Sequence, residues 1–167
     1  MPRQTPSKTK ADLAGCRLRP ARAAELPILL EHRRLMWVDM GRLGRDAKDP
    51  SAKAFHGWMS RHLRKKDILA IVAVEGDRIV ASGCVWFQET QPRPHLPQTA
   101  TPYLLSVYTE PDRRRLGLAR RIVEALIAES RRRGYGRVSL HASDEGRPLY
   151  DSLGFKASPE MWLDFPR

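Results

Sequence analysis

The sequence predicts an α/β protein in which helices flank a mixed central β-sheet. Strand-like runs and apolar positions of helical spacing follow one another in the order β-α-α-β-β-β-α-β-α-β. The length of 167 residues fits one domain, which we place at residues 16–167 after a basic tail of residues 1–15. An apolar fraction of 41% is typical of a chain that buries a core.

The first half of the chain is predicted to contain one strand, two helices and a β-hairpin. The strand covers residues 16–19, the helices cover 24–40 and 51–66, and the hairpin strands cover 68–75 and 78–87. Ser51 is a favoured N-cap residue at the start of the second helix. Gly76 and Asp77 separate the hairpin strands with residue types that tight turns prefer.

The second half is predicted to alternate between strands and helices after a proline-rich loop. The loop covers residues 90–102, strands follow at 103–109, 138–143 and 161–165, a long helix begins at 118, and a short helix ends at 154. Gly154 is the residue type that most often stops a helix. Pro148 fits the first turn of the short helix, where its missing N–H costs little.

An arginine-rich loop separates the strand at 103–109 from the long helix. Its sequence, Arg114-Arg115-Leu116-Gly117-Leu118-Ala119, reads R-x-x-G-x-A. The turn into the helix points free backbone N–H groups and the positive end of the helix dipole at one place. The loop lacks the Lys-Ser/Thr pair of a P-loop and the glycine spacing of a dinucleotide fingerprint. It predicts a pyrophosphate site, and an ordinary helix start with solvated arginines is the alternative.

A second motif lies about thirty residues further along the chain. The segment Leu149-Tyr150-Asp151-Ser152-Leu153-Gly154-Phe155 reads L-Y-x-x-L-G-F. Together with R-x-x-G-x-A, in this order and separation, it closely resembles the GNAT superfamily of N-acetyltransferases. The opening Leu18-Arg19-Pro20-Ala21, followed by Glu25-Leu26, also resembles the first strand and helix of that family. The resemblance covers residues 16–165.

The resemblance implies an acyl-CoA-dependent N-acetyltransferase with acetyl-CoA as its co-substrate. It implies that the fourth and fifth strands splay apart around the pantetheine arm. The implied contacts with acetyl-CoA are Val107, Tyr108, Thr109, Arg114, Arg115, Leu116, Gly117, Leu118, Ala119, Arg120, Ser143 and Tyr150. Tyr150 is also implied to be the general acid, because a phenol stays protonated at neutral pH and can donate to a leaving thiolate.

The general base and the acceptor pocket are predicted from position. An alkyl amine is mostly protonated at pH 7, so a group near it has to take up a proton. Glu89, at the end of the third strand, is the leading candidate for a catalytic base, with His95 and Asp39 behind it. Trp37 and Met40 are predicted to contact the acceptor between the first two helices and the proline-rich loop.

The acceptor is predicted to be a primary amine of a small molecule. Relatives that acetylate ribosomal-protein N-termini tend to carry a glutamate in the fifth strand, where this chain has Val138. Ser143 stands where many relatives have asparagine. Both departures disfavour a protein N-terminus as the acceptor. Acetylation of a protein lysine or N-terminus is the first alternative.

Charge and cysteine content bear on the remaining classes of function. The chain has 30 Lys and Arg against 19 Asp and Glu, a net charge of +11, which attracts polyanions. No recognition helix, zinc module or RNA-binding signature accompanies this charge, so we expect no specific nucleic acid. A basic nucleic-acid-binding module and a non-catalytic acyl-CoA sensor are the alternatives of a different class.

The compartment and the assembly are predicted from absences in the sequence. Two isolated cysteines and no membrane-length apolar run or secretory signal predict a cytoplasmic protein that is not bound to a membrane. No metal-ligand spacing occurs among the five histidines, so no metal is expected. We expect a monomer or a homodimer. In a homodimer, the last strand around Trp162 can pair or swap between subunits.

Overall fold

The computed structural model describes residues 15–165, and the predicted tail lies outside these residues except for Gly15. Five strands form one sheet in the order β1-β2-β3-β4-β5. They are β1 (Cys16–Pro20), β2 (Ile68–Glu75), β3 (Arg78–Glu89), β4 (Ala100–Thr109) and β5 (Ser139–Leu140). The first four strands pair antiparallel and β5 joins β4 in parallel, so the predicted mixed sheet is confirmed.

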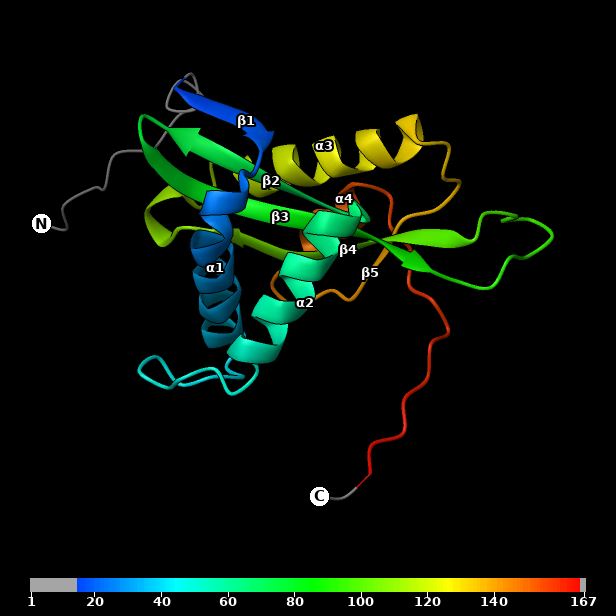
Figure 1. Cartoon of the computed structure of the whole chain (residues 1–167), viewed down its shortest axis with the longest axis horizontal. Coiled ribbons are helices and arrows are strands. Elements are labelled where there is room, and N and C mark those ends of the chain that lie inside the picture. The colour runs from blue at the N-terminus through cyan, green and yellow to red at the C-terminus, as the bar shows by residue number, and fades with distance from the viewer. Residues whose placement is uncertain (1–14, 166–167) are drawn as a thin grey trace, which may run out of the picture.

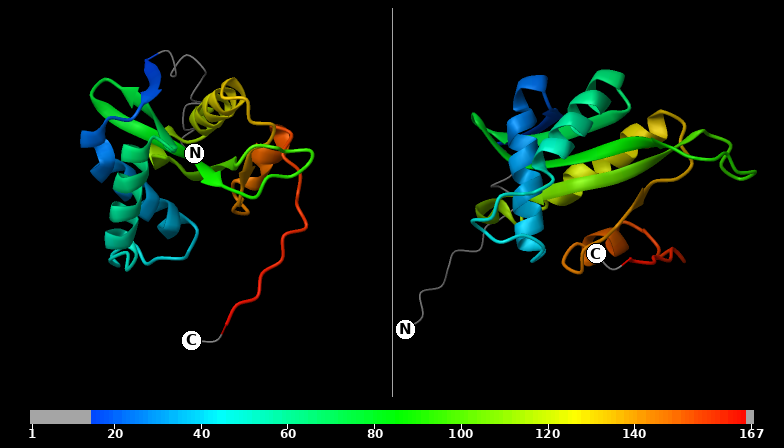
Figure 2. Two further views of the ribbon diagram at one scale, coloured as in Figure 1. Left: turned by 45° about the vertical axis from the view of Figure 1, so that its right-hand side comes forward. Right: turned by 60° about the horizontal axis from the view of Figure 1, so that its bottom comes forward.

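Helices cover both faces of the sheet, as Figure 1 and Figure 2 show. They are α1 (Leu26–Asp39), α2 (Ala52–Lys65), α3 (Leu118–Arg132) and α4 (Arg147–Ser152), with 3-10 turns at Ala23–Glu25 and Pro111–Arg113. α1 and α2 pack on one face of the sheet, whereas α3 and α4 pack on the other. The predicted order of elements is therefore confirmed from β1 to α4.

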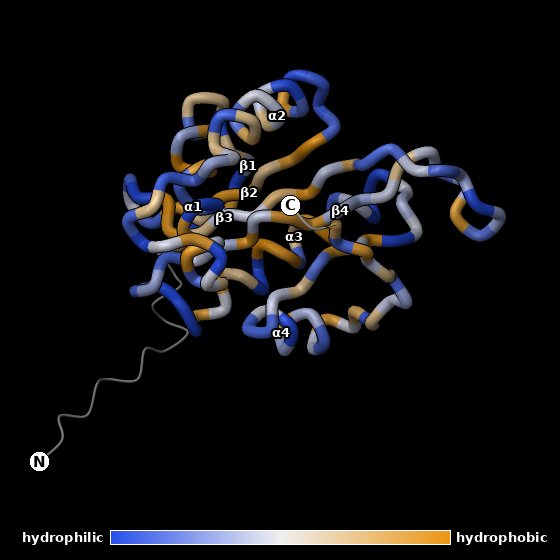
Figure 3. Tube along the Cα trace, turned by 90° about the horizontal axis from the view of Figure 1, so that it is seen from below, coloured by the Kyte–Doolittle hydropathy of each residue, from blue (hydrophilic) through white to orange (hydrophobic). Residues whose placement is uncertain are grey.

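The core lies between the strands and these two layers of helices, where the apolar stretches of the chain gather (Figure 3). From α3, Leu118, Ile122, Val123 and Leu126 are each at most 1% exposed and form one face of the helix. Met59 of α2 is fully buried on the opposite side of the sheet. Burial of each such side chain stabilises the fold by about 2 kcal/mol, so α3 is firmly held and fixes the loop before it.

A glycine in β3 lets α3 approach the sheet closely. A β-carbon on Gly83 would lie 2.7 Å from Cγ2 of Ile122 and 3.3 Å from Cγ2 of Val107. Opposite Gly83, two residues of β4, Ser106 and Val107, face a single residue of β3, which makes a β-bulge. This close packing and the bulge fix the end of β4 relative to the start of α3.

The predicted last strand, residues 161–165, is wrong. No strand forms there in the part of the chain that the structure describes. Its large apolar side chains, Met161, Trp162, Leu163 and Phe165, are between 74% and 92% exposed, and Figure 1 shows the segment running away from the sheet. A strand needs a hydrogen-bonding partner, and the apolar composition that predicted this one does not say where a partner lies.

The proline-rich loop is shorter than predicted, because β3 extends to Glu89 and β4 already begins at Ala100. Pro102 therefore lies inside a strand, opposite Phe87. The N–H of Phe87 donates to the carbonyl of Asp67, so it points away from β4. The two paired residues thus exchange no hydrogen bonds, and the N–H that proline lacks is not needed in this ladder.

A buried histidine joins α1 to the end of the sheet. His32 is 2% exposed, and its Nδ1 lies 2.8 Å from Oγ of Ser82. Its Nε2 lies 3.5 Å from a carboxylate oxygen of Glu110. Burial lowers the pKa of His32 from 6.5 to about 4. The folded protein therefore holds this imidazole in its neutral form.

We expect His32 to make the fold sensitive to acid. The unfolded chain binds this proton near pH 6.5, but the folded chain binds it only near pH 4. The contribution of the neutral His32 to the free energy of unfolding is therefore complete above pH 6.5 and is lost as the pH falls through about 4. This loss amounts to roughly 3 kcal/mol. Urea unfolding of wild type and His32→Gln across this range measures it. The variant should lose less stability on acidification, and parallel pH profiles would contradict the assignment.

Candidate functional site

The candidate site begins where two neighbouring strands separate. β4 and β5 pair through only two residue pairs, the last of which joins Leu104 to Leu140. β5 ends there, whereas β4 continues to Thr109 beside β3. Beyond Leu104, the edge of β4 that faces away from β3 has no strand beside it within residues 15–165. The three predicted pantetheine contacts, Val107, Tyr108 and Thr109, all lie on this open stretch.

The loop after β4 has the backbone shape of an anion cradle. Arg115 (φ 63°) and Gly117 (φ 83°) both lie in the left-handed region, and such conformations can turn successive N–H groups to one side. α3 begins at Leu118, and the N–H of Arg121 donates to the carbonyl of Gly117 at 3.1 Å. The N–H groups of the first helical turn before Arg121 have no partner within the helix. Leu116 and Leu118 are buried and anchor the loop, while Gly117 is exposed.

Two arginines are held by carboxylates at the start of this loop, Arg113 immediately before it and Arg114 as its first residue. Arg113 lies 2.7 Å from a carboxylate oxygen of Glu75, so it ties the loop to the β2–β3 hairpin. Arg114 lies 2.5 Å from a carboxylate oxygen of Asp39 at the end of α1. Its Nε also donates to the carbonyl of Thr109 at 2.9 Å. Arg114 thus connects the open edge of β4, the loop and the first helix.

A third arginine connects the loop to the second sequence motif. Arg120, in the first turn of α3, donates to the hydroxyl of Ser152 in α4, and it lies 3.5 Å from Glu124. α4 is the short helix that carries Tyr150. The structure therefore brings the R-x-x-G-x-A loop and the L-Y-x-x-L-G-F segment together, although about thirty residues separate them in the sequence.

Tyr150 is held by its neighbours through its ring. The ring packs edge-on against Phe155, with 5.7 Å between centroids, and a β-carbon on Gly146 would lie only 3.1 Å from it. The hydroxyl of Ser143 accepts the N–H of Gly146 at 3.1 Å and so holds the turn before α4. Burial raises the pKa of Tyr150 above its usual 10, and the phenol keeps its proton at neutral pH.

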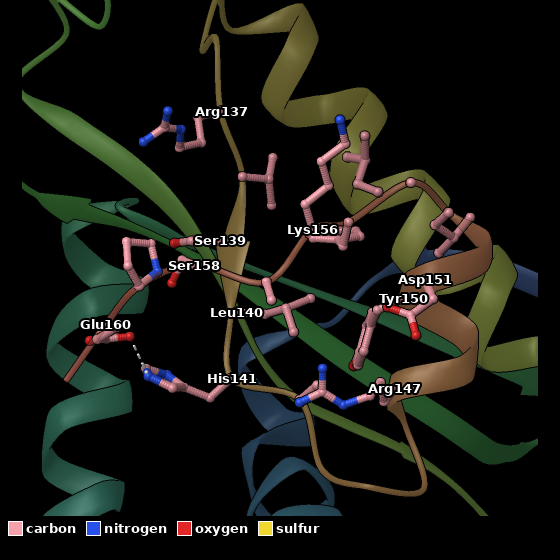
Figure 4. Close-up of a pocket in the computed structure, with 18 of the residues that line it drawn as sticks. Arg137, Ser139, Leu140, His141, Arg147, Tyr150, Asp151, Lys156, Ser158 and Glu160 are labelled. Atoms are coloured by element: carbon pink, nitrogen blue, oxygen red, sulfur yellow. Dashed lines mark hydrogen bonds and ion pairs between the residues drawn. The ribbon is translucent and has the colours of Figure 1, made fainter. Parts of the chain in front are cut away.

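A cleft of about 860 Å³ opens beside β5 (Figure 4). It lies between β5, α4, the last turns of α3 and the C-terminal segment, by which we mean residues 155–165. Tyr150, Arg147 and His141 line it together. Among the described residues its lining includes none from β4 or from the arginine loop. The cleft therefore adjoins the separated strands from the side of β5.

The three predicted base candidates lie at different places. Glu89 is exposed at the outer end of β3, where it pairs with Ala100, about 10 Å along the strand from Trp86. His95 lies in the connection between β3 and β4, and this connection projects beyond the rest of the sheet in Figure 1. Asp39 is already paired with Arg114. A general base has to reach the reacting proton by a hydrogen bond, and these placements argue against all three.

The predicted acceptor residues lie at the C-terminal end of α1. Trp37 is half-buried, and the guanidinium of Arg33 lies 5.5 Å from the centroid of its ring. Met40 is 37% exposed. Asp39, between them, pairs with Arg114, which places this helix end beside the arginine loop. Trp37 and Met40 therefore lie close to the candidate site, at the end of a helix that packs on β4.

Three polar side chains that sequence analysis missed meet where the strands separate. The hydroxyl of Tyr103 is hydrogen-bonded to Nδ1 of His141, and Nε2 of His141 lies 2.9 Å from a carboxylate oxygen of Glu160. They come from β4, from the residue after β5 and from the C-terminal segment, so no sequence spacing links them. The usable signal is the strand register, because Tyr103 pairs with Ser139, two residues before His141.

Residues 15–165 also bear on metal binding and on membrane insertion. No group of three or more His, Cys, Asp or Glu side chains is arranged there to hold a metal ion. No helix there is both long enough and apolar enough to cross a membrane. Cys16 and Cys84 are free thiols, and both are buried.

Three solved structures illustrate what the chain is similar to. A GCN5-related N-acetyltransferase of Ralstonia eutropha JMP134 is 28% identical, with a TM-score of 0.83, and the match covers 90% of this chain and 99% of that one. A predicted acetyltransferase of Clostridium acetobutylicum, solved with acetyl-CoA, is 24% identical, with a TM-score of 0.81 over 90% of this chain and 96% of its own. The glucosamine-6-phosphate N-acetyltransferase of Arabidopsis thaliana is 16% identical, with a TM-score of 0.61 over 90% and 97%.

The last two likenesses show the fold alone, because their sequence identities are low. No curated protein matches the chain significantly. The model of the acetyltransferase (GNAT) family, however, matches residues 30–155, which is well over half of the sequence. That range includes the open edge of β4, the arginine loop and Tyr150. The chain therefore belongs to the acetyltransferase (GNAT) family.

Proposed function

We propose that this protein transfers the acetyl group of acetyl-CoA to a primary amine of a small molecule. The observation that carries the proposal is the separation of β4 from β5 between a cationic loop and a protonated phenol. The open edge of β4 offers backbone groups to the pantetheine arm. The loop offers N–H groups and arginines to the pyrophosphate, and Tyr150 offers a proton to the sulfur. One acyl-CoA molecule needs all three.

The reaction follows from these placements. The amine nitrogen attacks the carbonyl carbon of the thioester, and the carbonyl oxygen takes up the negative charge. A backbone N–H on the open stretch, at Val107, Tyr108 or Thr109, donates to that oxygen, a contact worth about 3 kcal/mol in comparable sites. As the carbon–sulfur bond breaks, the hydroxyl of Tyr150 gives its proton to the thiolate of CoA. The acetyl group is then bound to the acceptor nitrogen as an amide.

The pyrophosphate is assigned to residues 114–120. The start of α3 supplies partial positive charge through its N–H groups, and Arg114 and Arg115 supply full charges at exposed positions. Arg113 is not included, because it is less exposed than Arg114 and ties the loop to the β2–β3 hairpin. Ser143 contributes by holding the turn that carries Tyr150, and its direct contact with acetyl-CoA stays a prediction.

A small amine is favoured over a protein amine for two reasons. Val138 occupies the fifth-strand position where relatives that acetylate protein N-termini tend to carry a glutamate. The Arabidopsis relative, which shares this fold, is named for an amino sugar. We assign Trp37 and Met40 to the acceptor, because the end of α1 that carries them lies beside the arginine loop. The free thiols of Cys16 and Cys84 fit a reducing compartment, which we take to be the cytoplasm.

Calorimetric titration with acetyl-CoA tests the donor half of the proposal. We expect micromolar affinity, and at least about tenfold weaker binding of S-acetylpantetheine, which lacks the pyrophosphate and its charge-assisted hydrogen bonds. Equal affinity for both donors would contradict the assignment of the loop. Failure to bind acetyl-CoA, with salt-sensitive retention on DNA, would favour the nucleic-acid-binding alternative.

A thiol-release assay with saturating acetyl-CoA tests the acceptor half. The panel contains glucosamine, kanamycin, spermidine and tyramine, beside a lysine-containing peptide and a peptide with a free N-terminus. We expect turnover with at least one of the four small amines. A clear preference for either peptide would replace the small-molecule assignment. Tight binding of acetyl-CoA without any turnover would favour the acyl-CoA sensor.

A further inference from the structure

We infer that Tyr103 accepts the proton of the attacking amine and passes its own proton to His141, which Glu160 holds in place. The inference rests on the proposed acetyl transfer and supplies the base that it needs. Reaching the neutral form of an alkyl amine at pH 7 costs about 4 to 5 kcal/mol, so a built path for the proton matters. The three side chains are joined in series by hydrogen bonds.

The chemistry of the three groups determines which atom donates each hydrogen bond. A carboxylate has no proton to donate, so Nε2–H of His141 donates to Glu160 across 2.9 Å. A neutral imidazole then has its lone pair on Nδ1, and the hydroxyl of Tyr103 donates to it. The backbone N–H of His141 also approaches the phenol oxygen, which leaves one lone pair of that oxygen for the N–H of an acceptor amine. Tyr103 therefore touches the amine, and His141 and Glu160 are positioning residues.

The faces of the sheet separate this base from the acid. Tyr103 pairs with Trp86 of β3, so both side chains lie on the same face, and Trp86 packs with the cluster under α1 and α2. Tyr150 packs with the opposite cluster, under α3. A thioester lying between the separated strands is thus reached by the amine from one face and by the acid from the other. α1, whose C-terminal end carries Trp37 and Met40, packs on the face of Tyr103.

The proton step balances without another reactant. Before the nitrogen–carbon bond forms, the bound ammonium gives one N–H proton to the oxygen of Tyr103, and the former Tyr103 proton moves to Nδ1 of His141. The neutral nitrogen then attacks the carbonyl carbon, and the tetrahedral adduct releases a second N–H proton to solvent. The imidazolium is paired with the carboxylate of Glu160, as in other imidazole relays. The side chains of His141 and Glu160 are 44% and 55% exposed, so the proton leaves from there to water. Tyr150 regains its proton from solvent after CoA has left.

The hydroxyl of Tyr103 cannot accept the proton of the amine unless the imidazole of His141 takes up the proton of the phenol. Burial, and secondly the charge of Glu160, raise the pKa of Tyr103 above its usual 10. Tyr103 is therefore protonated at neutral pH and accepts a proton only while it gives one away. Imidazole is the side chain that takes up protons near neutral pH. This dependence predicts that removing either Tyr103 or His141 breaks the same step.

Kinetics of Tyr103→Phe and His141→Gln test the relay with the best amine of the panel above. We expect each variant to lose about 100-fold in kcat near pH 7, the size of a general-base contribution. The loss should shrink as the pH approaches about 10.4, where the amine is neutral in solution. Glu160→Gln should lose about tenfold, because its exposed charge is screened by water. The affinity for acetyl-CoA should stay within about twofold in all three.

Matched substitutions control for packing. Tyr135→Phe removes the hydroxyl of a half-buried tyrosine whose ring stacks on Phe87, with 5.2 Å between the ring centroids. His62→Gln removes an imidazole whose Nδ1 lies 2.8 Å from a carboxylate oxygen of Asp67. Both controls should keep wild-type kcat. A Tyr103→Phe variant with kcat within about threefold of wild type near pH 7 would overturn the relay. So would a loss that is the same at every pH.

Nitrogen NMR of the histidine rings separates failure of the relay from failure of the proposed function. In wild type, the His141 signals should report a proton on Nε2 and a hydrogen bond to Nδ1. The Nδ1 signal should move in Tyr103→Phe and the Nε2 signal in Glu160→Gln. If acetyl-CoA binds but no amine accepts, the proposed function fails and the relay loses its substrate. If amines are acetylated while these signals do not move, the relay alone is overturned.

Discussion

Replacing Tyr150 by phenylalanine is expected to lower kcat about 100-fold, the usual contribution of a general acid, and to leave the affinity for acetyl-CoA nearly unchanged. The ring contacts with Phe155 and Gly146 survive the change. Within residues 15–165 no hydrogen bond to the Tyr150 hydroxyl is part of the fold, so the cost in stability is small. The proton that the CoA thiolate collects is what the variant lacks.

The pH dependence makes this prediction specific. A thiol has a reference pKa of about 8.5, so above that pH the thiolate leaves without needing a proton. The deficit of Tyr150→Phe should therefore shrink above about pH 8.5, well below the range where Tyr103→Phe recovers. Steady-state kinetics over this range, with calorimetry for binding, measure both effects. If Tyr150→Phe loses affinity and kcat equally, Tyr150 packs on the sulfur and does not donate to it.

Local patterns predicted most of the fold because most of its elements are locally determined. The apolar spacing from Leu118 to Leu126 identifies α3 without any knowledge of its neighbours, and these residues are indeed its buried face. Strands depend on partners that the local sequence does not name. The apolar run at 161–165 has the composition of a strand and forms none. Pro102 is predicted to lie in a loop, but it lies in β4. The N–H that it lacks would point away from β3, so the pairing of β4 with β3 does not need it.

The same distinction, between local sequence motifs and contacts that depend on tertiary pairing, applies to the residues of the candidate site. The arginine loop and Tyr150 lie in contiguous motifs, and the structure brings the two together through Arg120 and Ser152. Tyr103, His141 and Glu160 come from three segments whose meeting depends on strand register and on the course of the C-terminal segment. The prediction of Glu89 as a base depends on its place at the end of a strand, but β3 extends beyond the point where β4 and β5 separate and carries Glu89 away from it. Contacts made by tertiary pairing cannot be read from composition.

Replacing Gly117 by leucine is expected to weaken acetyl-CoA binding about 100-fold while leaving kcat at saturating donor nearly unchanged. A β-carbon on Gly117 meets no atom of the protein within 4 Å, so the new side chain projects into open space, where we propose that the pyrophosphate binds. It therefore displaces the ligand rather than the core. Calorimetry with acetyl-CoA and kinetics at high donor concentration measure the two effects.

A second glycine separates this steric effect from backbone strain. Gly134, at the other end of α3, has the same φ of 83° and the same empty surroundings. Leucine at either position is strained by the positive φ, which costs about 1 to 2 kcal/mol. Both variants should therefore unfold at similarly lowered temperatures. Only Gly117→Leu should lose affinity for acetyl-CoA. With S-acetylpantetheine, which has no pyrophosphate to displace, the two variants should bind alike. Equal affinities of both variants for acetyl-CoA would place the pyrophosphate elsewhere, because strain alone is common to the two.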